Sequence, residues 1–159
     1  MPLFTADLCD AHPDAVRVAD PIFQAYGQNL HFGGRIRTVR VLEDNVLIRK
    51  ALSEAGDGNV LVIDGGGSTR CALLGGNIAE LAAANGWGGV VVYGCVRDAH
   101  EIDAAGIGVR AIATCPKKSE KHGRGVLGVP VFFAGVDFRP GEYLYADRDG
   151  LIVTAEPLG

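Results

Sequence analysis

Two short runs of almost uninterrupted apolar residues constrain the fold of this chain more than any other feature. They are NVLVID at residues 59–64 and GVVVY at residues 89–93. A strand with one face in water alternates apolar and polar residues, whereas a short continuous run is typical of a strand covered on both faces. The chain also holds 23 glycines among 159 residues, which indicates many tight turns. The runs therefore predict buried strands at the centre of an α/β fold.

Helical and further β-like patterns flank these two runs. An apolar stripe predicts a helix that Asp44 or Asn45 caps and that continues to about Ala55, and an Ala-rich segment predicts another over 77–85. The remaining expected elements are helices over 5–11, capped by Thr5, and 98–105, and strands over 35–42, 71–74 and 109–114. The C-terminal part is turn-rich and β-like. We expect a single domain over residues 1–159 that is α/β in its middle, β-rich at its flanks and not a regular doubly wound sheet.

Charge and composition exclude several classes of protein. A net charge of −4 argues against broad electrostatic binding to nucleic acid, so we expect no direct nucleic-acid partner. No segment approaches the roughly 20 apolar residues of a membrane span, and residues 1–14 lack the pattern of a signal peptide, so we expect no membrane association. The four cysteines form no C-x-x-C pair, and we expect reduced thiols in a cytoplasmic protein.

A double glycine opens the second predicted helix, in the sequence Gly75-Gly76-Asn77-Ile78. The free N–H groups of a first helical turn, together with the positive end of the helix dipole, suit a carboxylate or a phosphate. Glu80 stands three residues after Asn77, so a capping box would explain both residues without a ligand. Taken alone, an ordinary strand-to-helix turn is the better interpretation.

Arg97-Asp98, with Glu101 three residues beyond Asp98, is more specific. An arginine can bind a carboxylate through two hydrogen bonds, and an aspartate can hold a hard cation such as Mg²⁺ with water in the other positions. Adjacent opposite charges are usually solvated surface. This pair, however, follows an apolar strand, and sites gather at that end of the strands in α/β proteins.

Other motifs have simpler interpretations. The glycine loop in NVLVIDGGGSTR is superficially similar to the first loop of S-adenosylmethionine-dependent methyltransferases, but no acidic residue ends the next long strand, so a tight turn after a buried strand is preferred. The four histidines show no metal-binding spacing. The basic loop at 117–124 is interpreted as solvated, with partner binding as the minor alternative.

With these residues identified, the chain resembles the RraA-like family over nearly its whole length. The similarity runs from LCDAH through FGGRIRTV, EDN, VLVIDGGGSTR and VVYGCVRD to LYADRDGLIV. That family includes regulator of ribonuclease activity A, formerly described as a menaquinone-pathway methyltransferase, and 4-hydroxy-4-methyl-2-oxoglutarate aldolases. The aldolases cleave their substrate to two pyruvates and decarboxylate oxaloacetate as a side activity. Their signature is a Gly, twenty residues, Arg-Asp, two residues and an acid, which Gly76, Arg97, Asp98 and Glu101 fit without a gap.

The resemblance implies a swivelling β/β/α fold, a homotrimer and a site for a small 2-keto acid. It implies that the amides of Gly75, Gly76, Asn77 and Ile78, together with Arg97, hold pyruvate, and that Asp98 positions a divalent cation, Mg²⁺ or Mn²⁺. We expect a water molecule beside the metal to act as base and Glu101 to be a supporting acid. Some aldolases have a longer C-terminal segment that reaches a neighbouring site; the sequence given ends at Gly159, so we expect no acid from such a segment.

The chemistry of the residues agrees with a metal rather than a Schiff base. Retro-aldol cleavage needs an electron sink at the ketone, and a lysine in that role must be desolvated. Lys50 lies in a polar part of a helix and Lys117, Lys118 and Lys121 lie in a charged loop. The first hypothesis is therefore a metal-dependent aldolase and oxaloacetate decarboxylase with Arg97, Asp98 and Glu101 as its catalytic residues. The alternative is a non-catalytic regulator that binds and inhibits an endoribonuclease of the ribonuclease E type.

Overall fold

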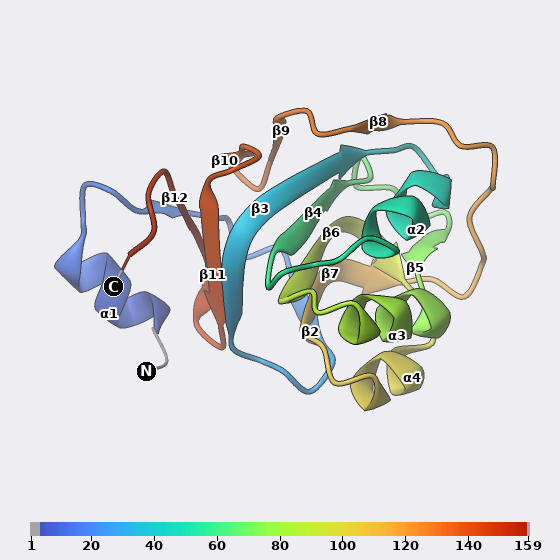
Figure 1. Ribbon diagram of the computed structural model, residues 1–159, viewed down its shortest axis with the longest axis horizontal. Helices are drawn as coiled ribbons and strands as arrows, with labels where there is room; N and C mark the ends of the chain where they lie inside the picture. The colour runs from blue at the N-terminus through green and yellow to red at the C-terminus, as the bar shows by residue number, and fades with distance from the viewer. Residues whose placement is uncertain (1–3, 159) are drawn as a thin grey trace.

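The chain folds into a sheet with parallel strands at its centre and antiparallel strands at its flanks (Figure 1). This computed structural model describes residues 4–158, so the ends of the domain expected over 1–159 (residues 1–3 and 159) lie outside the described residues. The strands are β1 (Arg17–Val18), β2 (Gln24–Tyr26), β3 (Phe32–Arg40), β4 (Val60–Asp64), β5 (Ala72–Leu74), β6 (Gly89–Val96), β7 (Val109–Thr114), β8 (Val126–Leu127), β9 (Val131–Phe133), β10 (Val136–Phe138), β11 (Tyr143–Asp147) and β12 (Gly150–Thr154). The helices are α1 (Thr5–Ala11), α2 (Val46–Leu52), α3 (Gly76–Ala84) and α4 (Ala99–Ala104).

The strand order is β1-β12-β11-β3-β4-β6-β7-β2, with β5 beside β6 and β8 beside β3. Strands β3, β4, β6 and β7 are parallel neighbours, and β5 runs parallel to β6. Strands β11, β12 and β1 continue the sheet in antiparallel pairs, and β9 and β10 form a separate hairpin. The expected α/β middle with β-rich flanks is confirmed.

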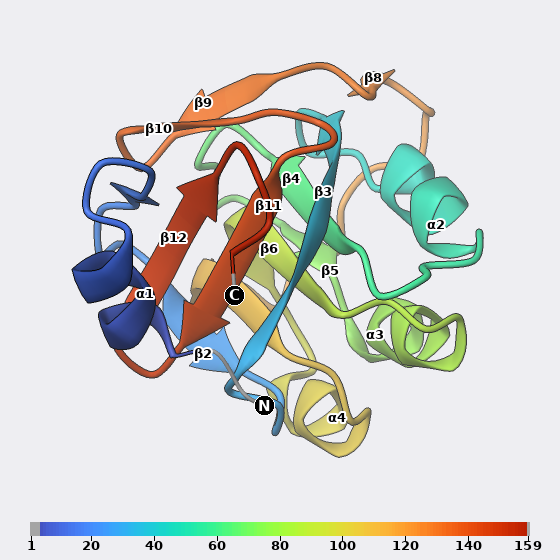
Figure 2. The ribbon, with the colours of Figure 1, turned by 60° about the vertical axis from the view of Figure 1, so that its left-hand side comes forward.

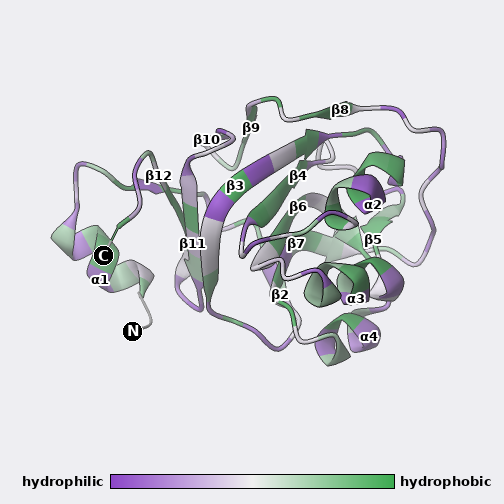
Figure 3. Cartoon of the chain, in the orientation of Figure 1, coloured by the Kyte–Doolittle hydropathy of each residue, from purple (hydrophilic) through white to green (hydrophobic). Residues whose placement is uncertain are grey.

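Two hydrophobic cores lie on opposite faces of the parallel strands. Successive side chains of a strand point to opposite faces, so Leu61 and Ile63 of β4 enter one core and Val60 and Val62 enter the other. Helices α2, α3 and α4 cover the first core, whereas β9 to β12 cover the second. Figure 3 shows β4 in green, as expected for a strand buried on both faces. The layers are thus β/β/α, as the resemblance implied.

Helix α1 lies apart from the other helices, against β11 and β12 (Figure 2). Thr5, predicted as its cap, is instead the first helical residue, and Phe4 occupies the capping position. The Thr5 hydroxyl and backbone N–H both donate to the buried carboxylate of Asp147, at 2.7 and 2.6 Å. Thr5 therefore binds Asp147, a residue distant in sequence, instead of capping its own helix.

Asp147 makes the stability of this fold dependent on pH. Burial alone would raise the pKa of its carboxyl, but the hydrogen bonds from Thr5 and Asp149 outweigh burial and lower the pKa below its ordinary value. A lowered pKa in the folded state stabilises the protein above the unfolded pKa of about 3.9, and that contribution is lost as pH falls through the folded value. We expect Asp147→Asn to cost about 1–3 kcal/mol of unfolding free energy at pH 7.

Urea unfolding of wild type and Asp147→Asn between pH 7 and pH 3 tests this expectation. The difference between the two proteins should shrink toward the acid end. Asp137→Asn is the matched control, because Asp137 lies in an exposed ion pair with Arg139 and should change little. A difference that stays constant over the whole range would contradict the role given to Asp147.

Several expected boundaries differ from the structure. Helix α2 ends at Leu52 rather than near Ala55, and β3 begins at Phe32, three residues before the expected start. Strand β6 continues to Val96 instead of ending at Tyr93, so its last residue directly precedes Arg97. The capping box of Asn77 and Glu80 is wrong: α3 begins at Gly76 with Gly75 as its cap, and no side chain caps it. Every helix within residues 4–158 is too short or too polar to span a bilayer.

Candidate active site

The candidate site lies at the carboxyl edge of the parallel strands. Parallel strands end on the same side of a sheet, and ligands in α/β folds bind outside those ends. The loops after β3, β4, β5, β6 and β7 all begin at this edge. They bring together the EDN motif (Glu43–Asn45), the triple glycine, the Gly75–Ile78 turn, the Arg97-Asp98 pair and the basic loop at 117–124. Segments far apart in the sequence therefore form one edge.

Asp98 stands between the end of β6 and the start of α4. Its backbone is left-handed, with φ 54° and ψ 47°, a conformation that Asp and Asn tolerate better than most residues. Its Oδ2 accepts a hydrogen bond from the backbone N–H of Gly76 at 3.2 Å, and no described residue donates to its Oδ1. The side chain is half-buried. A strained turn thus holds one carboxylate oxygen in place beside the start of α3.

The backbone of Arg97 is hydrogen-bonded to the end of β5, while most of its guanidinium remains free to bind a ligand. Its N–H donates to the carbonyl of Leu74, at the end of β5, at 3.0 Å. Its Nη1 makes a long contact of 3.4 Å with the carbonyl of Pro116. Among residues 4–158 no carboxylate pairs with it. The unpaired guanidinium beside Asp98 can therefore bind an anionic ligand.

The two glycines allow α3 to begin against this pair. A Cβ at Gly75 would lie 2.9 Å from Asp98 Oδ2 and 3.5 Å from Arg97 Cγ. After the two glycines, the backbone N–H groups of Asn77 and Ile78 have no acceptor among the described residues, as expected for a first helical turn. The start of α3, a helix of nine residues, therefore adds donors and a positive dipole end beside Arg97.

Glu101 lies on the first turn of α4 and packs against Gly76. A Cβ at Gly76 would lie 2.6 Å from both Cβ and Oε2 of Glu101. The residue is exposed and does not line the cavity described below. The structure therefore brings Glu101 to the glycine turn, but not into the space where Arg97 and Asp98 meet.

A methyl group at Gly76 should disrupt the site more than the fold. In Gly76→Ala the new Cβ meets the Cβ of Glu101, which cannot move without α4 and its cap Asp98. We expect a loss of about 1–3 kcal/mol in unfolding free energy and a fall of about 10²-fold in the rate of any reaction that this site catalyses. Glu80→Ala on the same helix is the control and should change neither quantity. Full activity in Gly76→Ala would show that the close approach is not needed.

A cavity of about 280 Å³ joins these residues. It is lined by Gly75, Gly76, Asn77, Ile78, Arg97 and Asp98, all predicted from the sequence, together with Ala72. Its other walls come from residues that were not predicted to belong to the site: Asn45, Arg49, Lys118, Ser119 and Lys121. Apart from the buried Ser119 the basic loop at 117–124 is exposed, as predicted, but three of its residues also line the cavity, which was not predicted.

Asp44 holds the basic loop over the cavity. Its Oδ2 accepts hydrogen bonds from the backbone N–H groups of His122 and Arg124 at 2.7 and 3.2 Å, and its Oδ1 accepts one from Val46 at 3.1 Å. Burial would raise the pKa of this carboxyl, but these hydrogen bonds lower it. The predicted cap of α2 is thus partly correct: Asn45 occupies the capping position, while the Asp44 side chain makes the bond.

The neighbours of Asp44 bind the adjacent loops. Glu43 accepts hydrogen bonds from the Ser68 hydroxyl and the Arg70 guanidinium, which lower the pKa of its carboxyl. Asn45 accepts one from Lys121 at 3.1 Å. Glu43 therefore positions the loop after β4, whereas Asp44 and Asn45 both bind the basic loop.

The glycine loop after β4 is a structural turn. The N–H groups of Gly65 and Gly67 donate to the carbonyl of Tyr93, and that of Gly66 donates to Asp64 Oδ1. The loop leads to β5 rather than to a helix. Its N–H groups are occupied, so it has none to offer a nucleotide-like cofactor, in agreement with the preferred interpretation of the sequence.

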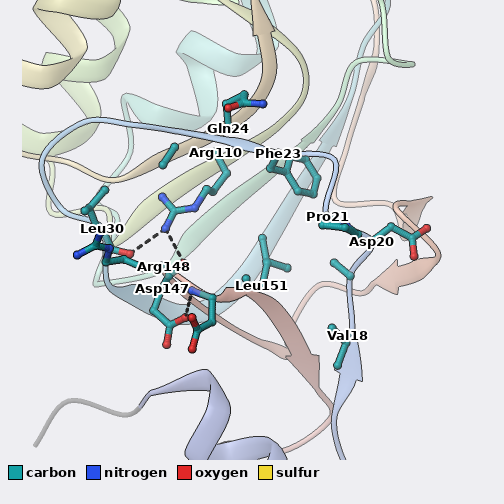
Figure 4. A pocket seen from close by; sticks show the side chains of 14 residues that line it. Val18, Asp20, Pro21, Phe23, Gln24, Leu30, Arg110, Asp147, Arg148 and Leu151 are labelled. Atoms are coloured by element: carbon teal, nitrogen blue, oxygen red, sulfur yellow. Dashed lines mark hydrogen bonds between the residues drawn. The ribbon is translucent and has the colours of Figure 1, made fainter.

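A larger cavity of about 540 Å³ lies elsewhere, between the β1–β2 connection and the β11–β12 turn (Figure 4). Its most buried cation, Arg110, donates to the carbonyls of Leu30 and Asp147 at 2.8 and 3.2 Å and stacks on Phe32. The Asp147 carboxylate is occupied by Thr5 and Asp149. The two buried charged groups of this cavity, Arg110 and Asp147, therefore already have partners within the chain.

The residues of the smaller cavity fit a divalent cation held mainly by water and substrate. Within residues 4–158 no three His, Cys, Asp or Glu side chains cluster as a metal cage. Mg²⁺ nevertheless often binds proteins through one or two carboxylates and keeps several waters. Asp98 supplies one such carboxylate, and its Oδ1 is not used by a described donor. The donor set thus suits an open metal site rather than a closed structural one.

Fold and site together define an α/β protein with a polar cavity at the carboxyl edge of its parallel strands. The chain belongs to the RraA-like family, because the family model described as Aldolase/RraA matches residues 5–153. A protein of Pseudomonas fluorescens Pf0-1, named as a candidate 4-hydroxy-4-methyl-2-oxoglutarate aldolase, is 54% identical over 97% of this chain and 94% of its own. One of Azotobacter vinelandii with the same name is 54% identical over 99% and 98%.

Two solved structures share the fold closely. The first, from Geobacillus kaustophilus, is named S-adenosylmethionine:2-dimethylmenaquinone methyltransferase; it has a TM-score of 0.96 and 50% identity, and covers 98% of this chain and 97% of its own. The second is the RNA-processing inhibitor RraA of Thermus thermophilus, with a TM-score of 0.96, 48% identity and coverage of 100% and 96%. The relatives thus bear names from three classes of function.

Proposed function

We propose that the protein is a metal-dependent aldolase that cleaves 4-hydroxy-4-methyl-2-oxoglutarate into two pyruvates and also decarboxylates oxaloacetate. One observation carries the proposal: Arg97, Asp98 and the start of α3 meet in a single cavity. The names of the relatives at 54% identity support it. The methyltransferase name of the Geobacillus protein gains no support here, because the N–H groups of the glycine loop are occupied.

Arg97 and the first turn of α3 bind the 2-keto acid end of the substrate. The guanidinium takes the carboxylate through two hydrogen bonds, and the N–H groups of Asn77 and Ile78 stabilise the negative charge that develops on the keto oxygen. Asp98 would hold a divalent cation, Mg²⁺ or Mn²⁺, that supplies a Lewis acid for the same oxygen. Both reactions pass through the enolate of pyruvate, so one set of donors serves both.

We propose that Glu101 supports the site by packing against the glycine turn rather than by contact with the substrate. Its packing on Gly76 keeps the donor N–H of that residue against Asp98. A lysine that forms a Schiff base needs a desolvated amine. Lys118 and Lys121 are exposed, so neither is suited to that role. We therefore assign the removal of the hydroxyl proton to water within the cavity.

A competition experiment tests whether one site carries both activities. Pyruvate release from 4-hydroxy-4-methyl-2-oxoglutarate should require Mg²⁺ or Mn²⁺ and stop in EDTA. Oxaloacetate should competitively inhibit the consumption of 4-hydroxy-4-methyl-2-oxoglutarate, with an inhibition constant equal to the KM of oxaloacetate as a substrate. Non-competitive inhibition would contradict a shared site.

A second candidate function is inhibition of an endoribonuclease of the ribonuclease E type. It is favoured by the 48% identity to the RNA-processing inhibitor of Thermus thermophilus over the whole chain. Binding to such a ribonuclease, measured by calorimetry, should be unchanged in Asp98→Ala if a surface outside the cavity is used. Both functions are compatible, because a cavity and a partner surface can coexist on one protein.

We also propose a cytoplasmic homotrimer. Large apolar side chains are exposed at several places, among them Val18, Leu42 and Phe132, as expected of surface that a neighbouring subunit covers. All four cysteines are free thiols, as in a reducing compartment. Light scattering should give three times the chain mass of 16.6 kDa; a monomer mass would contradict the assembly.

A further inference from the structure

The cavity beside Asp98 carries more positive charge than one substrate carboxylate requires. Its lining contains four cationic side chains, Arg49, Arg97, Lys118 and Lys121, against the single carboxylate of Asp98. In the proposed function Arg97 and the start of α3 take the keto-acid end of the substrate. Three cations therefore remain along the rest of the wall.

The protein does not neutralise these cations itself. Among residues 4–158, no carboxylate lies within ion-pair distance of Arg49 or Lys118. The nearest acids in sequence are engaged elsewhere: Glu120 pairs with His122 at 3.0 Å, and Glu43 binds Arg70. Lys121 donates to Asn45. The charge of Arg49 and Lys118 is thus available to a ligand.

The buried hydroxyl of Ser119 independently indicates that this cavity binds a ligand. Ser119 lines the same cavity and is only 5% exposed, yet its Oγ has no hydrogen-bond partner among the described residues. Buried hydroxyl groups are nearly always hydrogen-bonded, because an unpartnered one is destabilising. A hydroxyl hydrogen also rotates freely to suit an acceptor. Ser119 therefore indicates an acceptor that comes from outside the chain.

The backbone around Ser119 is held in place. The carbonyl of Lys117 accepts a hydrogen bond from Ala72 at 2.8 Å, and the N–H of Glu120 donates to the carbonyl of Glu43 at 2.8 Å. Asp44 holds the next residues of the loop. Lys118 and Ser119 thus belong to a fixed wall rather than to a free loop, which lowers the entropic cost of binding a ligand there.

We propose that Arg49, Lys118 and Ser119 form a second anionic subsite that takes the distal carboxylate of a dicarboxylic 2-oxo acid. The proposal rests on the proposed function for the orientation of the substrate. Arg49 can bind the carboxylate through two hydrogen bonds, Lys118 adds a point charge, and Ser119 donates its hydroxyl. The cavity, at about 280 Å³, suits a small diacid. These three residues would then select diacids over monoacids of the same length.

Binding of two unreactive probes tests the subsite. 2-Oxoglutarate and 2-oxopentanoate have the same chain length and differ in the distal carboxylate. Calorimetry with Mg²⁺ present should show about ten-fold tighter binding of 2-oxoglutarate to the wild type, because hydrogen bonds to charged groups are strong. Arg49→Ala, Lys118→Ala and Ser119→Ala should each reduce that ratio several-fold and leave the affinity for 2-oxopentanoate unchanged.

Matched controls separate a subsite from general damage. Lys117→Ala removes the neighbouring lysine, which does not line the cavity, and should keep the full ratio. Ser119→Ala should melt at the same temperature as the wild type or higher, since it removes an unpartnered buried hydroxyl. Equal affinity for both probes in the wild type, or a ratio that none of the three variants changes, would overturn the proposal. An intact ratio in a protein that releases no pyruvate would support the subsite and contradict the aldolase.

Discussion

Asp98→Asn should reduce pyruvate release by about 10³-fold or more while leaving the fold intact, because it removes the charge that would hold the cation and keeps the shape of the side chain. Asparagine tolerates the left-handed backbone at this position, where φ is 54°. Its side-chain oxygen can still accept the hydrogen bond from Gly76. The measurement is kcat/KM for 4-hydroxy-4-methyl-2-oxoglutarate at saturating Mg²⁺.

Asp57→Asn is the control for this substitution. Asp57 also has a left-handed backbone, with φ 52°, but it lies outside the cavity. It should therefore keep wild-type activity and reveal any general effect of the change. Activity of Asp98→Asn within a few-fold of the wild type would remove Asp98 from the chemistry, since a carboxamide is a poor substitute for a carboxylate at a metal.

Arg97→Lys should lower kcat/KM by about 10²-fold, even though the positive charge remains. A lysine has no planar pair of donors and cannot form the two parallel hydrogen bonds to a carboxylate. The guanidinium is otherwise free apart from the long contact with Pro116, so little structure depends on it. Because the carboxylate is bound in both the ground state and the transition state, we expect most of the loss in KM.

Arg139→Lys provides the comparison for this variant, because Arg139 lies in an exposed ion pair remote from the site. It should leave both kinetic constants unchanged. An increase in KM for oxaloacetate should accompany the increase for the larger substrate in Arg97→Lys, since both present the same 2-keto acid. A selective effect on one substrate would show that Arg97 does not bind the part they share.

The buried strands and the Arg-Asp pair could be predicted from sequence because their signals are local. The apolar runs in β4 and β6 define strands covered on both faces, and Arg97 directly follows one of them. The cap of α1 and the capping box of α3 were wrong for different reasons. Thr5 binds a tertiary partner, Asp147, and α3 begins at Gly76, one residue before the predicted start, with Gly75 as its cap.

The second half of the cavity wall could not be predicted from spacing. Arg49 and Lys118 are far apart in sequence and line the same cavity because α2 and the loop after β7 reach the same edge of the sheet. The run KKSEKHGR is typical of a solvated loop, and nothing in it indicates that Asp44 fixes its backbone. A buried Ser119 between exposed lysines becomes informative only when its burial is known.

The most direct test of the central claim is the stoichiometry of the reaction. Purified protein with Mg²⁺ should release two pyruvate molecules for each molecule of 4-hydroxy-4-methyl-2-oxoglutarate consumed, and EDTA should stop consumption and release together. That result would establish carbon–carbon cleavage at a metal-dependent site. Consumption no faster than the uncatalysed background, in a folded protein with Mg²⁺ present, would contradict the aldolase and favour the ribonuclease regulator.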